Sequence, residues 1–245
     1  AYVTLDMPDK RNALAAAMIA ELTDMAHTIG AARETRAIVL AGAGKVFCAG
    51  GDLAWMKQQI AADRAGRMRE ARKLAEMLNA LNEMPTPMIA RVHGGAFGGG
   101  VGMACVADVA MAADTAKFGL TETRLGLIPA TIGPYVLARM GEGNARRVFM
   151  SARLFGAVEA AELGIVAKAV PEVDLDAAIE AEVAPYLSVA PGAVGRAKSL
   201  ARYLGPRIDK AVIDETIERL ADSWEDPEAT AGIDAFFGKT PPPWA

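Results

Sequence analysis

Two glycine-rich loops in this chain have the composition of a site that stabilises negative charge. The first contains Ala49-Gly50-Gly51 and the second Gly98-Gly99-Gly100, where a helix is expected to start. Glycine lets a ligand approach the backbone closely, and the first N–H groups of a helix have no partner within it. If the fold brings the loops together, one N–H from each would hold the developing oxyanion of a carbonyl compound. The alternative is a tight helix–strand crossing that needs small residues.

One glutamate has a sequence context that suits proton transfer. Glu122 lies between two threonines and precedes the apolar segment Leu125–Pro129. A carboxyl group between apolar segments tends to have a raised pKa, which favours acid–base catalysis near neutral pH. The alternative is an ordinary surface charge paired with Arg124.

The other reactive residue types are better explained by structure than by catalysis. Ser151 and Ser199 lack the G-x-S-x-G pattern of a serine nucleophile, and no phosphate-binding loop motif is present. Cys48 and Cys105 lie in apolar surroundings, so we expect reduced, buried thiols. Two histidines without paired cysteine spacing predict no metal site. Asp52 is expected to cap a helix that starts at Leu53.

Length and charge restrict the class of protein. The chain has 245 residues, 52% of them hydrophobic, and suits one large domain or a domain with a small appendage. A net charge of −4, without Lys/Arg-rich runs, argues against a nucleic-acid partner. No signal peptide is visible and no apolar run approaches the ~20 residues of a membrane span, so we expect a cytoplasmic protein with no membrane partner. Because the sequence opens on a strand-like segment, we expect the natural chain to start further upstream.

Apolar patterning predicts alternating strands and helices in the first two thirds and mostly helices afterwards. The predicted strands are 2–5, 37–40, 88–92, 109–112, 117–118 and 165–170. The predicted helices are 11–30, one after Asp52, 63–83, one from Gly99, 143–151, 157–163, 176–189, 192–203 and 207–223. The fold class is therefore α/β with a helical C-terminal region.

Three motifs resemble those of the enoyl-CoA hydratase/isomerase (crotonase) superfamily. Phe47–Leu53 resembles F-C/S-A-G-A/G-D-I/L, and His93–Gly100 resembles G-x-A/C-x-G-G-G. Phe118–Pro129 resembles F-G-x-x-E-x-x-x-G-x-x-P. Their order and spacing also agree, and the resemblance runs from Val3 to the C-terminus. It implies a crotonase-like spiral of ββα turns with a helical C-terminal trimerisation region.

The resemblance also implies an organisation and a ligand. Residues 1–190 would form the ββα core with an acyl-CoA site, and residues 191–245 the helical C-terminal region. The partners would be an acyl-CoA substrate and further copies of the chain, in a homotrimer or homohexamer. No separate cofactor is expected, because coenzyme A is part of the substrate.

Site residues follow from the resemblance position by position. The oxyanion-hole donors fall on Gly51 and Gly99, and Glu122 matches the second of two family glutamates. The expected substrate-binding residues are Ala49, Asp52, Leu53, Gly98, Gly102 and Lys239. Lys239 falls where family members place a lysine near the CoA phosphate of a neighbouring subunit.

One position departs from the two-glutamate hydratases. The first glutamate would stand at position 102, where this chain has Gly102. Glu122 would then act alone, as in single-glutamate 3,2-enoyl-CoA isomerases, or the substrate would supply the missing group, or the protein would bind acyl-CoA with little activity.

Other segments, such as Gly51–Met56 and Leu127–Pro134, resemble bacterial methylglutaconyl-CoA hydratases of leucine breakdown and carboxygeranoyl-CoA hydratases. We therefore expect an enoyl-CoA hydratase acting on a short or branched 2-enoyl-CoA, with methylglutaconyl-CoA as one candidate. The alternatives are a 3,2-enoyl-CoA isomerase with Glu122 as sole base and a non-catalytic homologue that binds acyl-CoA or RNA.

Overall fold

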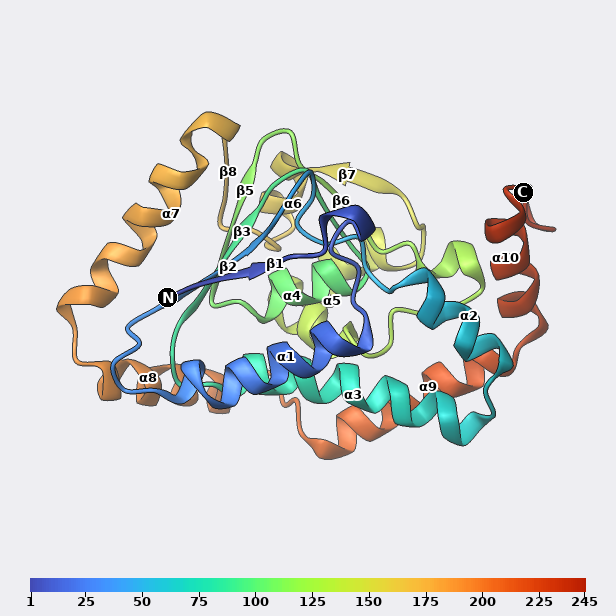
Figure 1. Ribbon diagram of the computed structural model, residues 1–245, viewed down its shortest axis with the longest axis horizontal. Helices are drawn as coiled ribbons and strands as arrows, with labels where there is room; N and C mark the ends of the chain where they lie inside the picture. The colour runs from blue at the N-terminus through green and yellow to red at the C-terminus, as the bar shows by residue number, and fades with distance from the viewer.

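The computed structural model describes residues 1–245 and is built on a five-stranded parallel sheet (Figure 1). The order of the strands in the sheet is β1-β2-β3-β5-β8. Their bounds are β1 Tyr2–Leu5, β2 Ile38–Gly42, β3 Met88–Val92, β5 Val109–Ala113 and β8 Lys168–Val170. Parallel strands are usually covered on both faces, which explains why β2 is apolar throughout and β3 is apolar except for Arg91.

Ten α-helices surround this sheet, and their order alternates with the strands in the first part of the chain. They are α1 Ala16–His27, α2 Leu53–Ala61, α3 Arg64–Glu83, α4 Gly99–Val106, α5 Gly133–Phe149, α6 Ala157–Glu162, α7 Leu175–Val183, α8 Pro191–Leu204, α9 Lys210–Glu225 and α10 Pro227–Gly238. None of them combines the length and the apolar composition needed to cross a bilayer.

The two faces of the sheet pack into different cores. Side chains alternate along a strand, so Ile38 and Leu40 of β2 enter the main core of 43 buried residues. Val39 points the other way and packs with Leu175 and Ile179 of α7 in a smaller cluster. Figure 1 shows α7 on the side of the sheet away from α1 and α3. The sheet is thus covered on both faces, as its apolar sequence requires.

A second, three-stranded sheet connects the loops that were singled out in the sequence. It consists of β4 Gly95–Phe97, β6 Lys117–Gly119 and β7 Leu154–Gly156. The patterning did not predict β4 or β7, because each has only three residues and carries glycine. Both elements matter for the site, since β4 leads directly into the second glycine loop and β6 leads into Glu122.

The last three helices confirm the predicted helical C-terminal region. Helix α9 packs along α3, where Ala71 and Ala75 meet Ile213 and Ile217 (Figure 1). Helix α10 packs against the short 3-10 helix η3, Glu122–Leu125. The C-terminal region therefore lies beside the segment that carries the candidate acid–base residue. The division at residue 190 and the role of this region in trimer formation stay predictions.

The predicted bounds are close in some elements and wrong in others. Strand β1 and helix α3 agree with the prediction, and Asp52 caps α2 as expected. Helix α5 begins at Gly133, ten residues before the predicted start at 143, and is interrupted at Gly141, where φ is 72°. The periodicity detected only the half of α5 that follows this break. The predicted strand 165–170 is reduced to β8.

Candidate active site

The structure brings the two glycine loops together. The Cys48 N–H donates to the Gly95 carbonyl at 3.2 Å, and the Phe97 N–H donates to the Cys48 carbonyl at 3.0 Å. Gly50 has a φ of 91°, and a Cβ at this position would lie 2.9 Å from the Phe97 carbonyl oxygen and 3.8 Å from the Gly99 nitrogen. Only glycine accommodates both the positive φ of Gly50 and the close approach of the Phe97 carbonyl oxygen.

The expected donors, the N–H groups of Gly51 and Gly99, bond to no acceptor in the protein. Leu14 holds the first loop on either side of Gly51, because its N–H donates to the Gly50 carbonyl and its carbonyl accepts from the Asp52 N–H. Gly99 is the first residue of α4, where N–H groups have no partner within the helix. Both glycines line one cavity of about 680 Å³. The cavity therefore contains two unused donors suited to an anion or a polarised carbonyl.

Asn12 positions the first loop, and the sequence reasoning missed this role. Its side chain is fully buried and accepts from the Met7 N–H at 2.9 Å. Its amide donates to the carbonyls of Ala43 and Val46 at 2.8 and 2.9 Å. All the hydrogen bonds of this side chain are therefore made to backbone groups in loops. Asn12 has a φ of 54°, a conformation that asparagine adopts more readily than most residues. That preference is the only signal that the sequence offered.

Glu122 directs its carboxyl group to the same place. A Cβ at Gly98 would lie 2.9 Å from Glu122 Oε1, so the carboxyl group lies against the residue that precedes the donor Gly99. Its other oxygen, Oε2, is buried and has no hydrogen-bond partner. Burial raises the pKa of Glu122 from 4.5 to about 7, because desolvation disfavours the charged form. Such a group can release and accept a proton near neutral pH.

The side chains of Thr123 and Arg124, next to Glu122 in the sequence, form hydrogen bonds with other groups and not with the Glu122 carboxyl group. Arg124 donates to the Ala152 carbonyl at 3.1 Å, and the Thr123 hydroxyl donates to the Met150 carbonyl at 3.1 Å. These bonds anchor η3 to the turn between α5 and β7. The alternative of a surface ion pair between Glu122 and Arg124 is therefore wrong for this structure.

Ile132 occupies the space beside Gly102. A Cβ at Gly102 would lie 2.5 Å from Ile132 Cγ2 and 3.8 Å from Leu78 Cδ2. Ile132 is buried and lines the cavity. Two acidic residues line the cavity, and of these Asp9 is exposed in the 3-10 helix η1, Pro8–Lys10. Glu122 is thus the one buried carboxyl group that faces the cavity.

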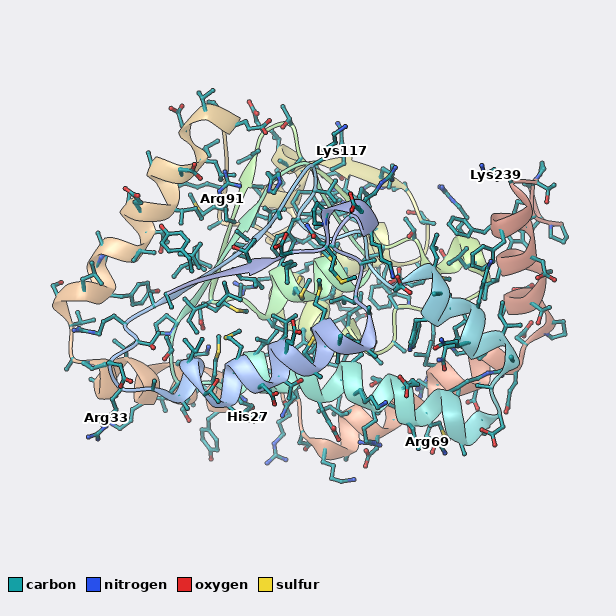
Figure 2. The ribbon with its side chains drawn as sticks, in the orientation of Figure 1. His27, Arg33, Arg69, Arg91, Lys117 and Lys239 are labelled. Carbon is teal, nitrogen blue, oxygen red and sulfur yellow. The ribbon has the colours of Figure 1, made fainter.

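The remaining expected site residues divide into two groups. Ala49, Leu53 and Gly98 line the cavity. Asp52 does not line it, since its carboxylate accepts from two backbone N–H groups at the start of α2 and pairs with a lysine. Gly102 is buried within α4, and Lys239 lies exposed at the far end of α10 (Figure 2). Within a single chain, these three residues do not contact the cavity.

Comparison with known proteins agrees with this geometry. A family model described as enoyl-CoA hydratase/isomerase matches residues 1–245. A Rhodobacter capsulatus protein named "Probable enoyl-CoA hydratase" is 36% identical over 247 residues, which cover 99% of this chain and 93% of the relative. An enoyl-CoA hydratase structure from Shewanella pealeana has a TM-score of 0.80 and 37% identity over 99% of this chain and 91% of the other. One from Mycobacterium avium has a TM-score of 0.84 and 29% identity, covering 100% and 93%. The chain belongs to the enoyl-CoA hydratase/isomerase family.

Proposed function

We propose that the protein is an enoyl-CoA hydratase that adds water to a short or branched 2-enoyl-CoA. The observation that carries this proposal is the Glu122 carboxyl group, which is buried, lacks a partner at Oε2 and lies against Gly98. Two unused N–H groups lie beside it in the same cavity. A carboxyl group of raised pKa beside two unused donors supports this proposal, because conjugate addition of water to a thioester requires an acid–base group and stabilisation of an oxyanion.

The thioester carbonyl would accept hydrogen bonds from the Gly51 and Gly99 N–H groups. Negative charge develops on this oxygen when a nucleophile adds to the β-carbon. In other enzymes, removing one such donor raises the activation free energy by ~3–4 kcal/mol. Glu122 takes a proton from water, the hydroxide adds to the β-carbon and an enolate forms. Glu122 then returns the proton to the α-carbon. Its pKa of about 7 suits both steps.

One observation favours 3,2-enoyl-CoA isomerisation as the second candidate. Ile132 fills the space beside Gly102 and leaves Glu122 as the one buried carboxyl group that lines the cavity. A single carboxylate suffices to remove a proton from one carbon of a 3-enoyl-CoA and deliver it to another. Hydration needs, in addition, room for a water molecule at the β-carbon.

The deciding experiment incubates the purified protein separately with crotonyl-CoA, 3-methylglutaconyl-CoA and a 3-enoyl-CoA, and follows the conjugated-enoyl absorbance and the product masses. Methylglutaconyl-CoA is included because of the resemblance to hydratases of leucine breakdown. Loss of conjugation with the mass of one water supports the hydratase. Conjugation gained from a 3-enoyl-CoA without a mass change supports the isomerase, and no turnover of any enoyl-CoA refutes both.

Glu122→Gln separates catalysis from binding. This variant should lose ~10²–10⁴-fold in kcat, because an acid–base group is removed, while its affinity for a saturated acyl-CoA stays within a few-fold. Glu76→Gln, at an exposed position of α3, is the matched control. Equal kcat in wild type and Glu122→Gln would exclude Glu122 from the mechanism.

Assembly is the remaining part of the proposal. We expect a homotrimer or homohexamer, in which Lys239 would reach the CoA phosphate of a neighbouring subunit. Sedimentation measures the state, and Lys239→Ala should raise the Kd for CoA without changing that state. An unchanged Kd would remove Lys239 from the binding site.

A further inference from the structure

Arg91 is the one charged residue of the buried strand β3, and it lies between this strand and α7 (Figure 2). Side chains alternate along a strand, so Arg91 points to the same face as Ile89, which packs with α7. The Arg91 guanidinium donates to Asp176 of α7 at 2.6 Å and lies 3.3 Å from His93 Nδ1. A charge in an otherwise apolar strand thus has one partner on α7 and one directly before the second glycine loop.

The contact with Arg91 determines which nitrogen of His93 carries the proton. A guanidinium has no acceptor, so Nδ1 accepts the hydrogen bond and the proton of the neutral ring lies on Nε2. Nε2 then donates to the Gly44 carbonyl at 2.9 Å. Gly44 lies in the segment 43–48, which leads from β2 into the first glycine loop. The His93 side chain therefore connects the segments that carry the two loops.

The backbone holds the same two segments close together. The Phe47 N–H donates to the His93 carbonyl at 2.9 Å. A Cβ at Gly94 would lie 1.8 Å from the Lys45 carbonyl oxygen, so only glycine fits there. A shift of the segment 43–48 would therefore change its contact with the start of the second loop.

Three carbonyls of the segment 43–48 depend on side-chain donors. Asn12 donates to those of Ala43 and Val46, and His93 donates to that of Gly44, which lies between them in the sequence. No backbone N–H donates to any of the three. The bond from His93 lies at the surface, so water can replace it as a partner of the carbonyl. Water does not, however, tie this segment to β3.

We propose that His93, oriented by Arg91, is a positioning residue that fixes the first glycine loop so that the Gly51 N–H points at the thioester oxygen. This inference rests on the proposed function, since the role of Gly51 as a donor is part of it. A backbone donor stabilises an oxyanion only if it is held in place before the reaction. A displacement of about 1 Å can cost ~10²-fold in rate. Loss of the His93 side chain should therefore affect the reaction much more than the stability of the fold.

Kinetics of two His93 variants test the inference. His93→Ala should lower kcat at least ~10-fold with KM nearly unchanged, because the transition state loses more than the bound substrate does. His93→Gln should recover most of this kcat, since its amide can donate to the Gly44 carbonyl and accept from Arg91. His27→Ala, at an exposed position in the last turn of α1, is the matched control and should leave kcat unchanged. Equal kcat in wild type and His93→Ala, or no recovery in His93→Gln, would overturn the inference. Thermal unfolding checks that each variant is folded.

Infrared spectra of bound butyryl-CoA, isotope-labelled at its thioester carbonyl, test the inference without turnover. Hydrogen bonds to this oxygen lower its stretching frequency. The lowering should be smaller in His93→Ala than in wild type and should be restored in His93→Gln. An equal lowering in wild type and His93→Ala would overturn the role of His93 and leave the donors in place, whereas no lowering in wild type would overturn both. An inactive protein that shows the expected pattern would refute the proposed hydratase and support this inference.

Discussion

Replacing the candidate catalytic carboxyl group should stabilise the fold, and the gain should grow with pH. Glu122 has a pKa of about 7 in the folded protein, against an ordinary value of 4.5, because its carboxyl group is buried with Oε2 unpaired. Below pH 4.5 both states hold the proton and burial has no electrostatic cost. As pH rises toward 7, the unfolded chain releases its proton while the folded protein retains it. The free energy of unfolding therefore falls as pH rises from 4.5 to 7. Above pH 7 the destabilisation caused by burying the Glu122 carboxyl group is complete and stays constant.

The size of this effect follows from the difference between the two pKa values. Each pKa unit corresponds to about 1.4 kcal/mol, so the cost in the wild type is about 1 kcal/mol at pH 5 and about 3 kcal/mol at pH 8. Glutamine is neutral throughout and nearly isosteric, so Glu122→Gln removes the cost. For a chain of 245 residues, the gain at pH 8 corresponds to an increase of roughly 6–12 °C in Tm.

Thermal unfolding of wild type and Glu122→Gln between pH 5 and pH 8.5 measures this gain. Protein concentration is held constant, because assembly would make Tm concentration-dependent. Glu76→Gln, an exposed substitution of the same kind, should show no gap that grows with pH. A Tm difference that is independent of pH, or a glutamine variant that is less stable throughout, would refute the argument that Glu122 is buried as an unpaired acid.

Three further predictions concern the same site. The kcat/KM should fall tenfold for each pH unit below about 7, because the ionised form of Glu122 is the base, and a pH–rate profile that is flat down to pH 5 would contradict this. Gly98→Ala should lower kcat at least ~100-fold, since φ is 48° and the new Cβ would lie 2.9 Å from Glu122 Oε1. Steady-state kinetics measure this loss, and a change below tenfold would refute it. Asn12→Ala should lower the free energy of unfolding by about 3 kcal/mol, because it leaves three half-buried backbone groups, those of Met7, Ala43 and Val46, unpaired. Urea unfolding measures this change, and a loss below 1 kcal/mol would show that water replaces the amide.

The elements that the sequence predicted well are those whose stability is local and repetitive. Helix α3 has a long amphipathic pattern, and its end at two prolines limits the position of its C-terminus. Strand β2 is apolar on both faces, and β3 is so except for Arg91, which is the pattern of a buried parallel sheet. The glycine loops could also be identified from the sequence, because a close approach between two backbone segments restricts the residue type to glycine.

What the sequence left open depends on contacts between distant segments. Strand β4 has only three residues, and its pairing with the first loop cannot be read from its own composition. Asn12 acts through three backbone groups of other segments. The burial of Glu122 is likewise set by packing, and its sequence context was also compatible with a surface ion pair to Arg124.

Gly102 and Ile132 show how such a contact limits the chemistry. Gly102 follows Gly99 by three residues on α4, so a side chain at 102 would lie on the same face as the donor N–H group. Ile132 already fills that space, and its Cγ2 would lie 2.5 Å from any Cβ at 102. A glutamate at 102 would therefore have to displace a buried side chain that also lines the cavity of the candidate active site. The packing of α4 against Ile132, the residue before α5, thus leaves no space for a side chain at 102, and Glu122 is the one buried carboxyl group that lines the cavity.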